Sequence, residues 1–343
     1  MSEPILQVAN LHVDFQTYGG VVQAVRGVSF DVCAGQTLAI VGESGCGKSV
    51  TVQSLMGLIP MPPGRIHQGS AHLRGHDILA SKVIDGQDIR GSQISMIFQD
   101  PMTSLNPTMN IGSQIAETLE VHKGYSKSDA FARAIELLDM SKIPEAAKRA
   151  KQYPFEFSGG MLQRAMIAMA IACEPAILVA DEPTTALDVT IQAQILDLLG
   201  DLQQETGMAI ILITHDLGVV ARMADEVMVM YAGEVVERGG VDDIFYRSGH
   251  PYTQGLRLAM PTNNQDTEAN QTLVAIDGSP PDLFNPPRGC AYHPRCPYAM
   301  QVCAEQAPPT RTLGADHQAQ CWLHHEMAGA LPDGLVSASK VGQ

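Results

Sequence analysis

The sequence contains few aromatic residues, few basic residues and no long apolar segment. Aromatic side chains account for 5% of its 343 residues, and there is a single tryptophan. The longest nearly uninterrupted apolar run, residues 165–173, is much shorter than the stretch of about 20 residues that a bilayer-spanning helix needs. The first residues also lack the basic-then-apolar order of a signal peptide. We therefore expect no membrane-spanning segment and a cytoplasmic location.

The shortage of basic residues bears on the partners of the chain. Lys and Arg number 22 against 37 Asp and Glu, which gives a formal net charge of −15. Proteins that bind nucleic acids usually carry a basic surface, so no nucleic acid partner is expected. A hydrophobic fraction of 45% and a charged fraction of 17% also exclude a disordered chain. The length suits one large domain with a smaller addition, or two domains.

Apolar periodicity indicates an α/β fold. Residues 6–30 alternate between apolar and polar side chains, which predicts an antiparallel β subdomain at the N-terminus. Further along, strand-like and helix-like segments alternate, which predicts a mostly parallel core sheet covered by helices. The expected strands are 37–41, 94–98, 177–180, 209–213 and 227–230, and the expected helices are 48–58, 191–204 and 217–224. Residues 112–173 interrupt this alternation and are predicted to form a helical subdomain.

The composition changes after Pro261. Residues 262–272 are polar, and residues 280–297 are rich in proline, which continues neither helices nor central strands. We expect a main domain over residues 1–260, a C-terminal extension over 261–330 and a loose tail over 331–343.

A phosphate-binding loop is predicted between the strand 37–41 and the helix that follows it. Residues 42–49 match the pattern G-x-x-x-x-G-K-S/T in the strand–loop–helix context that the motif requires. Glycines let backbone N–H groups turn inward around phosphate oxygens, and the helix N-terminus favours negative charge. Lys48 would reach the β- and γ-phosphates, and Ser49 would bind Mg²⁺. The expected nucleotide contacts are Gly42, Ser44, Gly45, Cys46, Gly47, Lys48, Ser49 and Val50.

Two acidic residues follow the predicted strand 177–180. Asp181 is placed to hold Mg²⁺, and Glu182 is placed to polarise an attacking water. A solvated turn is the competing interpretation of two adjacent acids, and the phosphate-binding loop makes it less attractive.

Several further motifs resemble those of ATP-binding cassette (ABC) ATPases. Residues 157–164 are similar to the signature motif of this family, although Phe and Met stand where Leu and Gln are commonest. The resemblance implies a P-loop NTPase fold, ATP as substrate, and contacts from Ser158, Gly159 and Gly160 to ATP held by a facing subunit. Residues 185–188 resemble the D-loop at the seam between two such subunits.

Three further residues resemble nucleotide contacts of this family: two polar residues expected near the γ-phosphate and one aromatic residue expected near the adenine. Gln99 matches the Q-loop glutamine that contacts Mg²⁺ and water, and His215 matches the switch histidine. Glu182, His215 and Gln99 are thus the expected catalytic residues, and Ser49, Gln99 and Asp181 the expected Mg²⁺ ligands. Tyr18 lies about where an aromatic ring would stack on adenine. A surface tyrosine is the alternative interpretation, and Phe15 is a rival.

The closest resemblance is to the ATPase subunits of bacterial oligopeptide and dipeptide importers. It is carried by residues 99–107, 157–161, 181–189 and 250–253. It implies a peripheral protein on the cytoplasmic face of the inner membrane. The implied partners are two permease subunits, a second and usually paralogous ATPase, and an extracytoplasmic peptide-binding protein. An importer of nickel or glycosides, or a soluble ABC ATPase outside transport, are the alternatives.

Four of the seven cysteines, Cys290, Cys296, Cys303 and Cys321, lie within a short part of the extension. Four thiolates can hold tetrahedral Zn²⁺ or an iron–sulfur cluster. The gaps are longer than those of short zinc knuckles and differ from ferredoxin spacings, so the spacing leaves the metal open. The family resemblance favours a 4Fe-4S cluster, with Zn²⁺ or free buried cysteines as alternatives.

Residues 100–107 contain two prolines and are expected to form a stiff loop. With the helical subdomain, this loop would form a groove for a permease helix, to which Met102, Leu105 and Met109 contribute. The competing interpretation is that these apolar side chains belong to the core.

Overall fold

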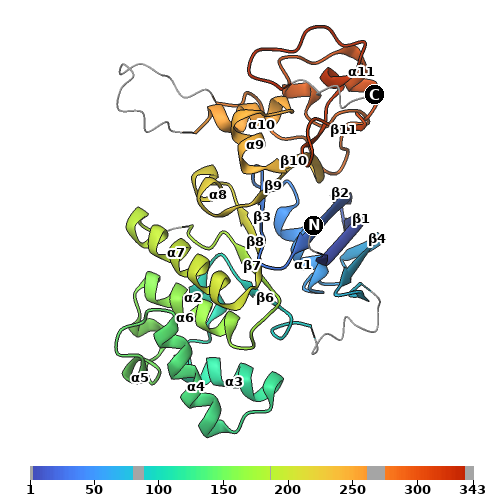
Figure 1. Cartoon of the computed structure of the whole chain (residues 1–343). Helices are drawn as coiled ribbons and strands as arrows, with labels where there is room; N and C mark the ends of the chain where they lie inside the picture. Colours follow the sequence, from blue (N-terminus) through green and yellow to red (C-terminus); the bar gives the residue numbers. More distant parts are fainter. Residues whose placement is uncertain (1–2, 80–88, 186, 261–274, 337–343) are drawn as a thin grey trace, which may run out of the picture.

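Two β-sheets and a group of helices make up the fold, seen in a computed structural model that describes residues 3–79, 89–185, 187–260 and 275–336. The N-terminal sheet is antiparallel, with the strand order β2-β1-β4-β5 (Figure 1). Its strands are β1 (Pro4–Thr17), β2 (Gly20–Cys33), β4 (Gly64–Leu73) and β5 (His76–Asp77). The expected antiparallel N-terminal subdomain is therefore confirmed, and its alternating apolar residues face a buried core.

The second sheet has the strand order β11-β12-β10-β9-β3-β8-β7-β6. Neighbours from β9 to β6 are parallel, whereas β10, β11 and β12 pair antiparallel. The strands are β3 (Thr37–Val41), β6 (Ile94–Ile97), β7 (Ile177–Asp181), β8 (Ala209–Thr214), β9 (Glu226–Tyr231), β10 (Glu234–Gly240), β11 (Thr310–Thr312) and β12 (Gln318–Gln320). Every residue of β3, β7 and β8 is buried, as strands covered on both faces require.

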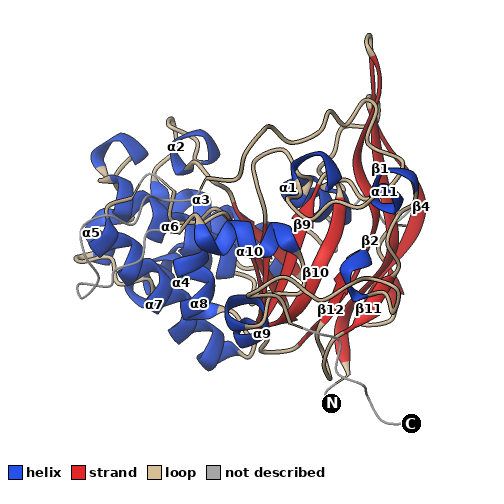
Figure 2. Cartoon of the chain, turned by 90° about the horizontal axis from the view of Figure 1, so that it is seen from above, coloured by secondary structure: helices blue, strands red, loops and turns tan. Residues whose placement is uncertain are grey.

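The helices fall into two groups along the chain, and Figure 2 shows α4, α5 and α6 of the first group on the side of the molecule away from β1, β2 and β4. The helical subdomain contains α2 (Pro101–Ser104), α3 (Ile111–Lys123), α4 (Lys127–Met140), α5 (Ala146–Arg149), η1 (Pro154–Glu156) and α6 (Gly159–Ile171). The other group contains α1 (Lys48–Leu55), α7 (Val189–Thr206), α8 (Leu217–Met223), α9 (Val241–Tyr246) and α10 (Pro251–Leu258). Among the described residues, no helix is long and apolar enough to cross a membrane.

Local signals explain where the helices of the subdomain begin and end. The side chain of Asn110 accepts a hydrogen bond from the N–H of Ser113 and caps α3, which ends at Gly124 in the left-handed conformation. Ser126 caps α4 in the same way two residues later. Such closely spaced stop and start signals give an antiparallel helix pair joined by a short loop.

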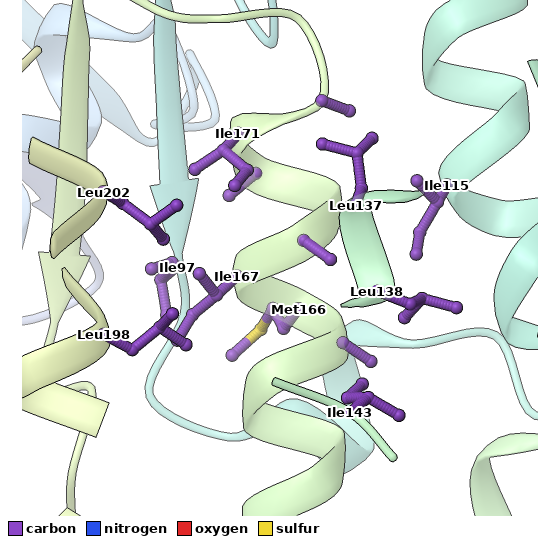
Figure 3. Close-up of a cluster of buried hydrophobic side chains, with 14 of the residues drawn as sticks. Ile97, Ile115, Leu137, Leu138, Ile143, Met166, Ile167, Ile171, Leu198 and Leu202 are labelled. Atoms are coloured by element: carbon purple, nitrogen blue, oxygen red, sulfur yellow. The ribbon is translucent and has the colours of Figure 1, made fainter. Parts of the chain in front are cut away.

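One apolar cluster joins the helical subdomain to the sheet, so the subdomain is not an independent core. Helix α6 lies at its centre, and Met166 and Ile167 of this helix are buried (Figure 3). Ile97 of β6 and Leu198 of α7 belong to the same cluster. The helical subdomain and the strands β6 and β7 therefore pack in one core.

The segment after β6 differs from the sequence-based prediction. Residues 101–104 form the short helix α2, capped by Asp100 and begun by Pro101, instead of being part of the stiff loop expected over residues 100–107. Leu105 is 3% exposed and belongs to the shared core, so its assignment to an open groove was wrong. Met102, in contrast, is 60% exposed. Proline at the first helical position, which was read as a loop signal, favours a helix start here.

The C-terminal extension adds two strands to the edge of the second sheet, which the proline content did not predict. Strand β12 pairs with β10, and β11 pairs with β12. The rest of the extension includes η2 (His293–Arg295), α11 (Gln301–Glu305) and η3 (Trp322–His324). The expected boundary at 261–275 falls almost entirely outside the described residues, as do residues 337–343 of the expected tail.

Candidate nucleotide-binding site

The loop over residues 42–49 connects β3 to α1, where the sequence places a phosphate cradle. A side chain at Gly42 would lie 2.2 Å from the carbonyl oxygen of Met230, and one at Gly47 would lie 2.4 Å from that of Ala24. Both glycines also have positive φ, 151° and 102°. Only glycine fits at these two positions, because the backbone packs directly on β2 and β9. Between them, Ser44 and Gly45 are exposed.

The side chain of Lys48 lies under this loop and is 6% exposed. Its Nζ donates hydrogen bonds to the carbonyl oxygens of Gly42 (2.7 Å) and Glu43 (3.0 Å). The Sγ of Cys46 is 3.8 Å away, and burial raises the pKa of that thiol. Cys46 therefore supports the loop as a neutral, packed side chain, while Lys48 holds a positive charge beneath the loop.

Ser49 and Asp181 meet as the sequence predicts. The Oγ of Ser49 donates a hydrogen bond of 3.0 Å to Oδ1 of Asp181. Asp181 is 8% exposed, and burial raises the pKa of its carboxyl group, an effect that the Ser49 hydrogen bond opposes. A carboxylate beside a hydroxyl provides the oxygen ligands that Mg²⁺ prefers, so the two residues fit the expected ion. The two residues that the sequence assigns to Mg²⁺ are thus in contact, and Ser49 directly follows Lys48 in the chain.

Glu182 is the meeting point of the remaining polar residues. Its Oε2 accepts hydrogen bonds from the Nε2 of Gln99 (2.8 Å) and the Oγ1 of Thr185 (3.0 Å). Its Oε1 lies 3.1 Å from the Nδ1 of His215. The backbone of Glu182 has a φ of 49°, a conformation that costs roughly 1–3 kcal/mol for a residue with a side chain. Strain of this kind persists where the surroundings fix a side chain for a function.

The topology explains why these residues converge. Gln99, Glu182 and His215 follow β6, β7 and β8, which are adjacent parallel strands, so their carboxyl ends lie at one edge of the sheet. The sequence predicted this grouping for all three residues. It did not single out the hydroxyl of Thr185 as a partner of Glu182. Position 186 of the expected D-loop lies outside the described residues, and Asp188 caps α7.

The signature residues lie away from the cradle at the start of α6. Ser158 is the N-cap residue, and its Oγ accepts a hydrogen bond of 3.4 Å from the N–H of Met161. Ser158 and Gly159 are exposed, and Gly160 approaches Ile191 so closely that an added Cβ would lie 2.8 Å from it. The described hydrogen bonds of these residues do not reach the cradle of the same chain. Their role toward a facing subunit remains a prediction.

Tyr18 lies at the turn between β1 and β2 and is fully exposed. Its rival Phe15 is partly buried in the N-terminal core, where its ring packs near Gly64. The structure thus leaves Tyr18 with a ring free to take a ligand and gives Phe15 a packing role. Adenine stacking by Tyr18 remains a prediction.

Besides burial, neighbouring cysteines contribute to the raised pKa values of three of the four clustered cysteines, Cys290, Cys296 and Cys321. Burial, with smaller contributions from neighbouring cysteines, raises the pKa of Cys290 to about 11 and that of Cys321 to about 12. The N–H of Cys290 donates to the carbonyl oxygen of Cys303 (2.8 Å), and none of these four thiols is in a disulfide. However, the described residues contain no group of three or more side chains placed to hold a metal ion. The expected metal site is therefore not confirmed.

Three residues near the cradle were not identified from the sequence. Glu43 occupies a variable position of the loop motif, Tyr252 belongs to a segment noted only for its resemblance, and Arg295 lies in the extension. Hydrogen bonds join Tyr252 and Arg295 to Glu43. The only local signal was the glutamate itself, an acidic residue in a loop that binds anions.

Comparison with known families agrees with this arrangement. The ABC transporter family model matches residues 25–185, and the model for the C-terminal region of oligopeptide/dipeptide transporters matches residues 236–303. The oligopeptide transport ATP-binding protein OppD of Bacillus subtilis is 55% identical over 94% of this chain and 89% of its own length. The dipeptide transport ATP-binding protein DppD of the same organism is 53% identical over 95% and 96%.

Solved structures show the same fold for the main domain. The dimeric cassette MJ0796, bound to ADP and phosphate, is 25% identical with a TM-score of 0.60, covering 69% of this chain and 98% of its own. The protein cbiO1 of Clostridium perfringens is 26% identical with a TM-score of 0.60, covering 71% and 91%. Fold and site together define an ABC ATPase. Within that class, the chain belongs to the family of oligopeptide and dipeptide transport ATP-binding proteins.

Proposed function

We propose that this protein hydrolyses ATP to drive the import of dipeptides or oligopeptides through a membrane ABC transporter. The observation that carries the proposal is the convergence of Gln99, Thr185 and His215 on Glu182, next to the Ser49–Asp181 pair. The peptide substrate is favoured by the relatives, which are named for oligopeptide and dipeptide transport. The protein would bind at the cytoplasmic face of the inner membrane as a peripheral subunit.

The residues of the site take the following roles in this proposal. Lys48 exchanges its two backbone carbonyl partners for phosphate oxygens, because a charged phosphate is a stronger acceptor for the ammonium group. Ser49 and Asp181 would hold Mg²⁺, which would neutralise phosphate charge when bound. Glu182 orients and polarises the attacking water, whose oxygen bonds to the γ-phosphorus as the bond to the ADP oxygen breaks. Gln99 and His215 position that carboxylate.

A second ATPase subunit completes the site in this proposal. Ser158 and Gly159 are exposed and Gly160 is half-buried at the N-terminus of a 13-residue helix, where unsatisfied N–H groups favour a phosphate. They would contact ATP bound to the facing subunit, and Tyr18 would stack on the adenine of this chain's own ATP. Two permease subunits and an extracytoplasmic peptide-binding protein form the rest of the complex. The second ATPase would be a paralogue.

The test is transport by the assembled complex. The protein is co-expressed with the permease, ATPase and binding-protein genes that neighbour its own, and the complex is reconstituted in liposomes. ATP-dependent uptake of labelled di- and oligopeptides is expected, with uptake abolished by Glu182→Gln. Uptake of nickel or glycosides but not of peptides would contradict the proposed peptide substrate. ATP hydrolysis without any association with permeases would contradict the proposed role in transport.

We also propose that the four cysteines of the extension hold a 4Fe-4S cluster. The proposal is supported by the gathering of Cys290, Cys296, Cys303 and Cys321 in one short part of the extension, where four thiolates could hold either a cluster or Zn²⁺. The resemblance to peptide-importer ATPases favours the cluster. Such a group would cross-link an extension with a small core of its own.

Elemental analysis tests this second proposal. Protein purified without oxygen is assayed for iron, acid-labile sulfide and zinc. Iron and sulfide in equal amounts are expected, and Cys303→Ser should remove both. Stoichiometric zinc without sulfide would show that the cysteines hold a zinc ion instead of a cluster. Metal-free protein with normal stability would show that the cysteines are packed thiols.

A further inference from the structure

Arg295 of the C-terminal extension binds Glu43 of the phosphate-binding loop. Its Nη1 lies 2.6 Å from Oε2 of Glu43, and its Nη2 lies 3.0 Å from Oε1. The Arg295 side chain is 4% exposed and that of Glu43 is 26% exposed. Paired, two-point contacts between guanidinium and carboxylate are directional as well as strong, especially when shielded from water. The contact therefore fixes the orientation of the Glu43 side chain.

Every N–H group of this guanidinium has a partner. Besides the two contacts to Glu43, Nε donates to the carbonyl oxygen of Asp277 (2.8 Å), Nη2 to that of Ile276 (3.2 Å) and Nη1 to the hydroxyl of Tyr231 (3.2 Å). The Glu43 hydrogen bonds are the largest cause of a raised pKa for Arg295. A buried arginine with all its donors engaged is held rigidly, so it can position the residue it binds.

The backbone of Glu43 is held on both sides. Its N–H donates to the hydroxyl of Tyr252 at 2.8 Å, and its carbonyl oxygen accepts from Lys48 at 3.0 Å. Tyr252 is fully buried and packs with the rings of Tyr231 and Tyr292, with centroid distances of 4.6 and 5.3 Å. The first turn of the cradle is thus bound to the main domain and to the extension at one residue.

The extension also contacts the hairpin that carries Tyr18. The N–H of Gln23 in β2 donates to the carbonyl oxygen of Leu283 at 2.9 Å. The ring of Phe284 lies beside Gly19 and Gly20, where an added Cβ would be within 3.5 and 3.7 Å of it. The extension therefore touches both the phosphate loop and the turn next to the expected adenine position.

We propose that Arg295 is a positioning residue for nucleotide binding, which holds the phosphate-binding loop through Glu43 and makes the ATP affinity of this chain depend on its C-terminal extension. The inference rests on the proposed function only in taking ATP as the ligand. When Lys48 turns to the phosphates, it leaves the carbonyl oxygen of Glu43. Arg295 and Tyr252 then keep Glu43 in place, so the loop is ordered before binding and loses less entropy on binding.

The experiment measures the Kd for ATP of the purified full-length chain with Mg²⁺. The variants are Arg295→Met, Glu43→Gln and the double variant, and Arg133→Met is the matched control at a partly exposed ion pair of the helical subdomain. Each single variant should raise the Kd roughly tenfold, since losing one partner of a shielded ion pair is costly. The double variant should be no weaker than the singles, because they remove the same interaction. The control should keep the wild-type Kd.

Two further readouts separate positioning from a general loss of structure. Arg295→Lys keeps the positive charge but cannot make the two-point contact of the guanidinium group with Glu43. Its affinity for ATP should lie between that of Arg295→Met and that of the wild type. In the assembled complex, KM for ATP should rise in Glu43→Gln, while kcat at saturating ATP stays within about twofold of wild type. A lower kcat with unchanged KM would overturn the inference.

The binding data also distinguish the inference from the proposed function. If Arg295→Met does not fold, Glu43→Gln decides, because its side chain is partly exposed and the extension remains intact. Unchanged Kd in folded single variants, or additive losses in the double variant, would overturn the inference while leaving the ATPase assignment in place. Failure of the wild-type chain to bind ATP would instead contradict the proposed function.

Discussion

The Nδ1 of His215 lies 3.1 Å from Oε1 of Glu182, although 33 residues separate them along the chain. The histidine is largely exposed, with 61% of its side chain accessible, whereas Glu182 is 18% exposed. One side of the carboxylate therefore meets a ring that solvent or a ligand can reach. The other side is fixed by Gln99 and Thr185. This arrangement suits a base whose orientation responds to the γ-phosphate.

Replacing the carboxylate of Glu182 should separate binding from hydrolysis. Glu182→Gln keeps the shape of the side chain but removes its negative charge, so ATP should still bind while turnover falls by roughly 10² or more, as expected for a lost general base. Phosphate release and equilibrium nucleotide binding measure the two effects. Glu136→Gln, on an exposed helical surface, is the control and should behave as wild type. Near-normal turnover in Glu182→Gln would contradict the assigned role.

A substitution at Ser158 should act on a neighbouring subunit. Ser158→Arg places a large side chain at an exposed helix start, so ATP in this chain's own cradle should bind normally, and the site built on the partner's cradle should fail. Complexes that combine mutant and wild-type ATPases, each with one inactivated cradle, measure the two sites separately. Loss confined to the mutant chain's own site would argue against a shared site.

Two neighbouring apolar residues should respond differently to the same change. Leu105→Glu buries a charge in the shared core and should prevent folding, because an unpaired buried carboxylate costs several kcal/mol. Met102→Glu changes an exposed side chain, so folding and ATP binding should be retained. Thermal unfolding and ATP binding test both expectations. Impaired assembly with the permeases in Met102→Glu would identify its surface as a contact, and normal assembly would exclude Met102 from one.

The raised pKa of Asp181 predicts a conflict between stability and Mg²⁺ binding. Since burial raises this pKa above that of the unfolded chain, the charged carboxylate opposes folding at neutral pH, and the effect fades as pH falls through the raised pKa. Asp181→Asn should therefore raise the Tm at pH 7 in Mg²⁺-free buffer, with a smaller gain at acidic pH. It should also abolish the Mg²⁺ dependence of ATP binding. Asp139→Asn, at an exposed position, is the control. A lower Tm at pH 7 would refute the expectation.

The sequence predicted those parts of the fold and site that depend on residues close together in the chain. The loop over residues 42–49 requires Gly42 and Gly47 for steric reasons that a local motif records. Asp181 ends the fully buried strand β7 and Glu182 follows it, so their place at the sheet edge could be predicted from periodicity. Alternation of strands and helices was enough to predict the parallel core.

Contacts between segments far apart in the sequence could not be predicted from local motifs or periodicity. The burial of Leu105 depends on packing against the helical subdomain, and its neighbours in sequence give no sign of that packing. The pairing of β12 with β10 involves a strand of only three residues, which is too short for sequence periodicity to predict. Arg295 carries no motif at all, and its partner is identified only by the fold.

The separation of 252 residues between Glu43 and Arg295 has a consequence for synthesis of the chain. At about 5–20 residues per second, the ribosome adds Arg295 roughly 13–50 s after Glu43. During that interval the nascent cradle has its glycines and lysine but not the arginine that orders it. A chain released early, before residue 295, would carry a complete set of hydrolytic residues and yet compete poorly for cellular ATP. The order of translation would thereby leave unfinished copies with a weaker affinity for ATP than the completed chain.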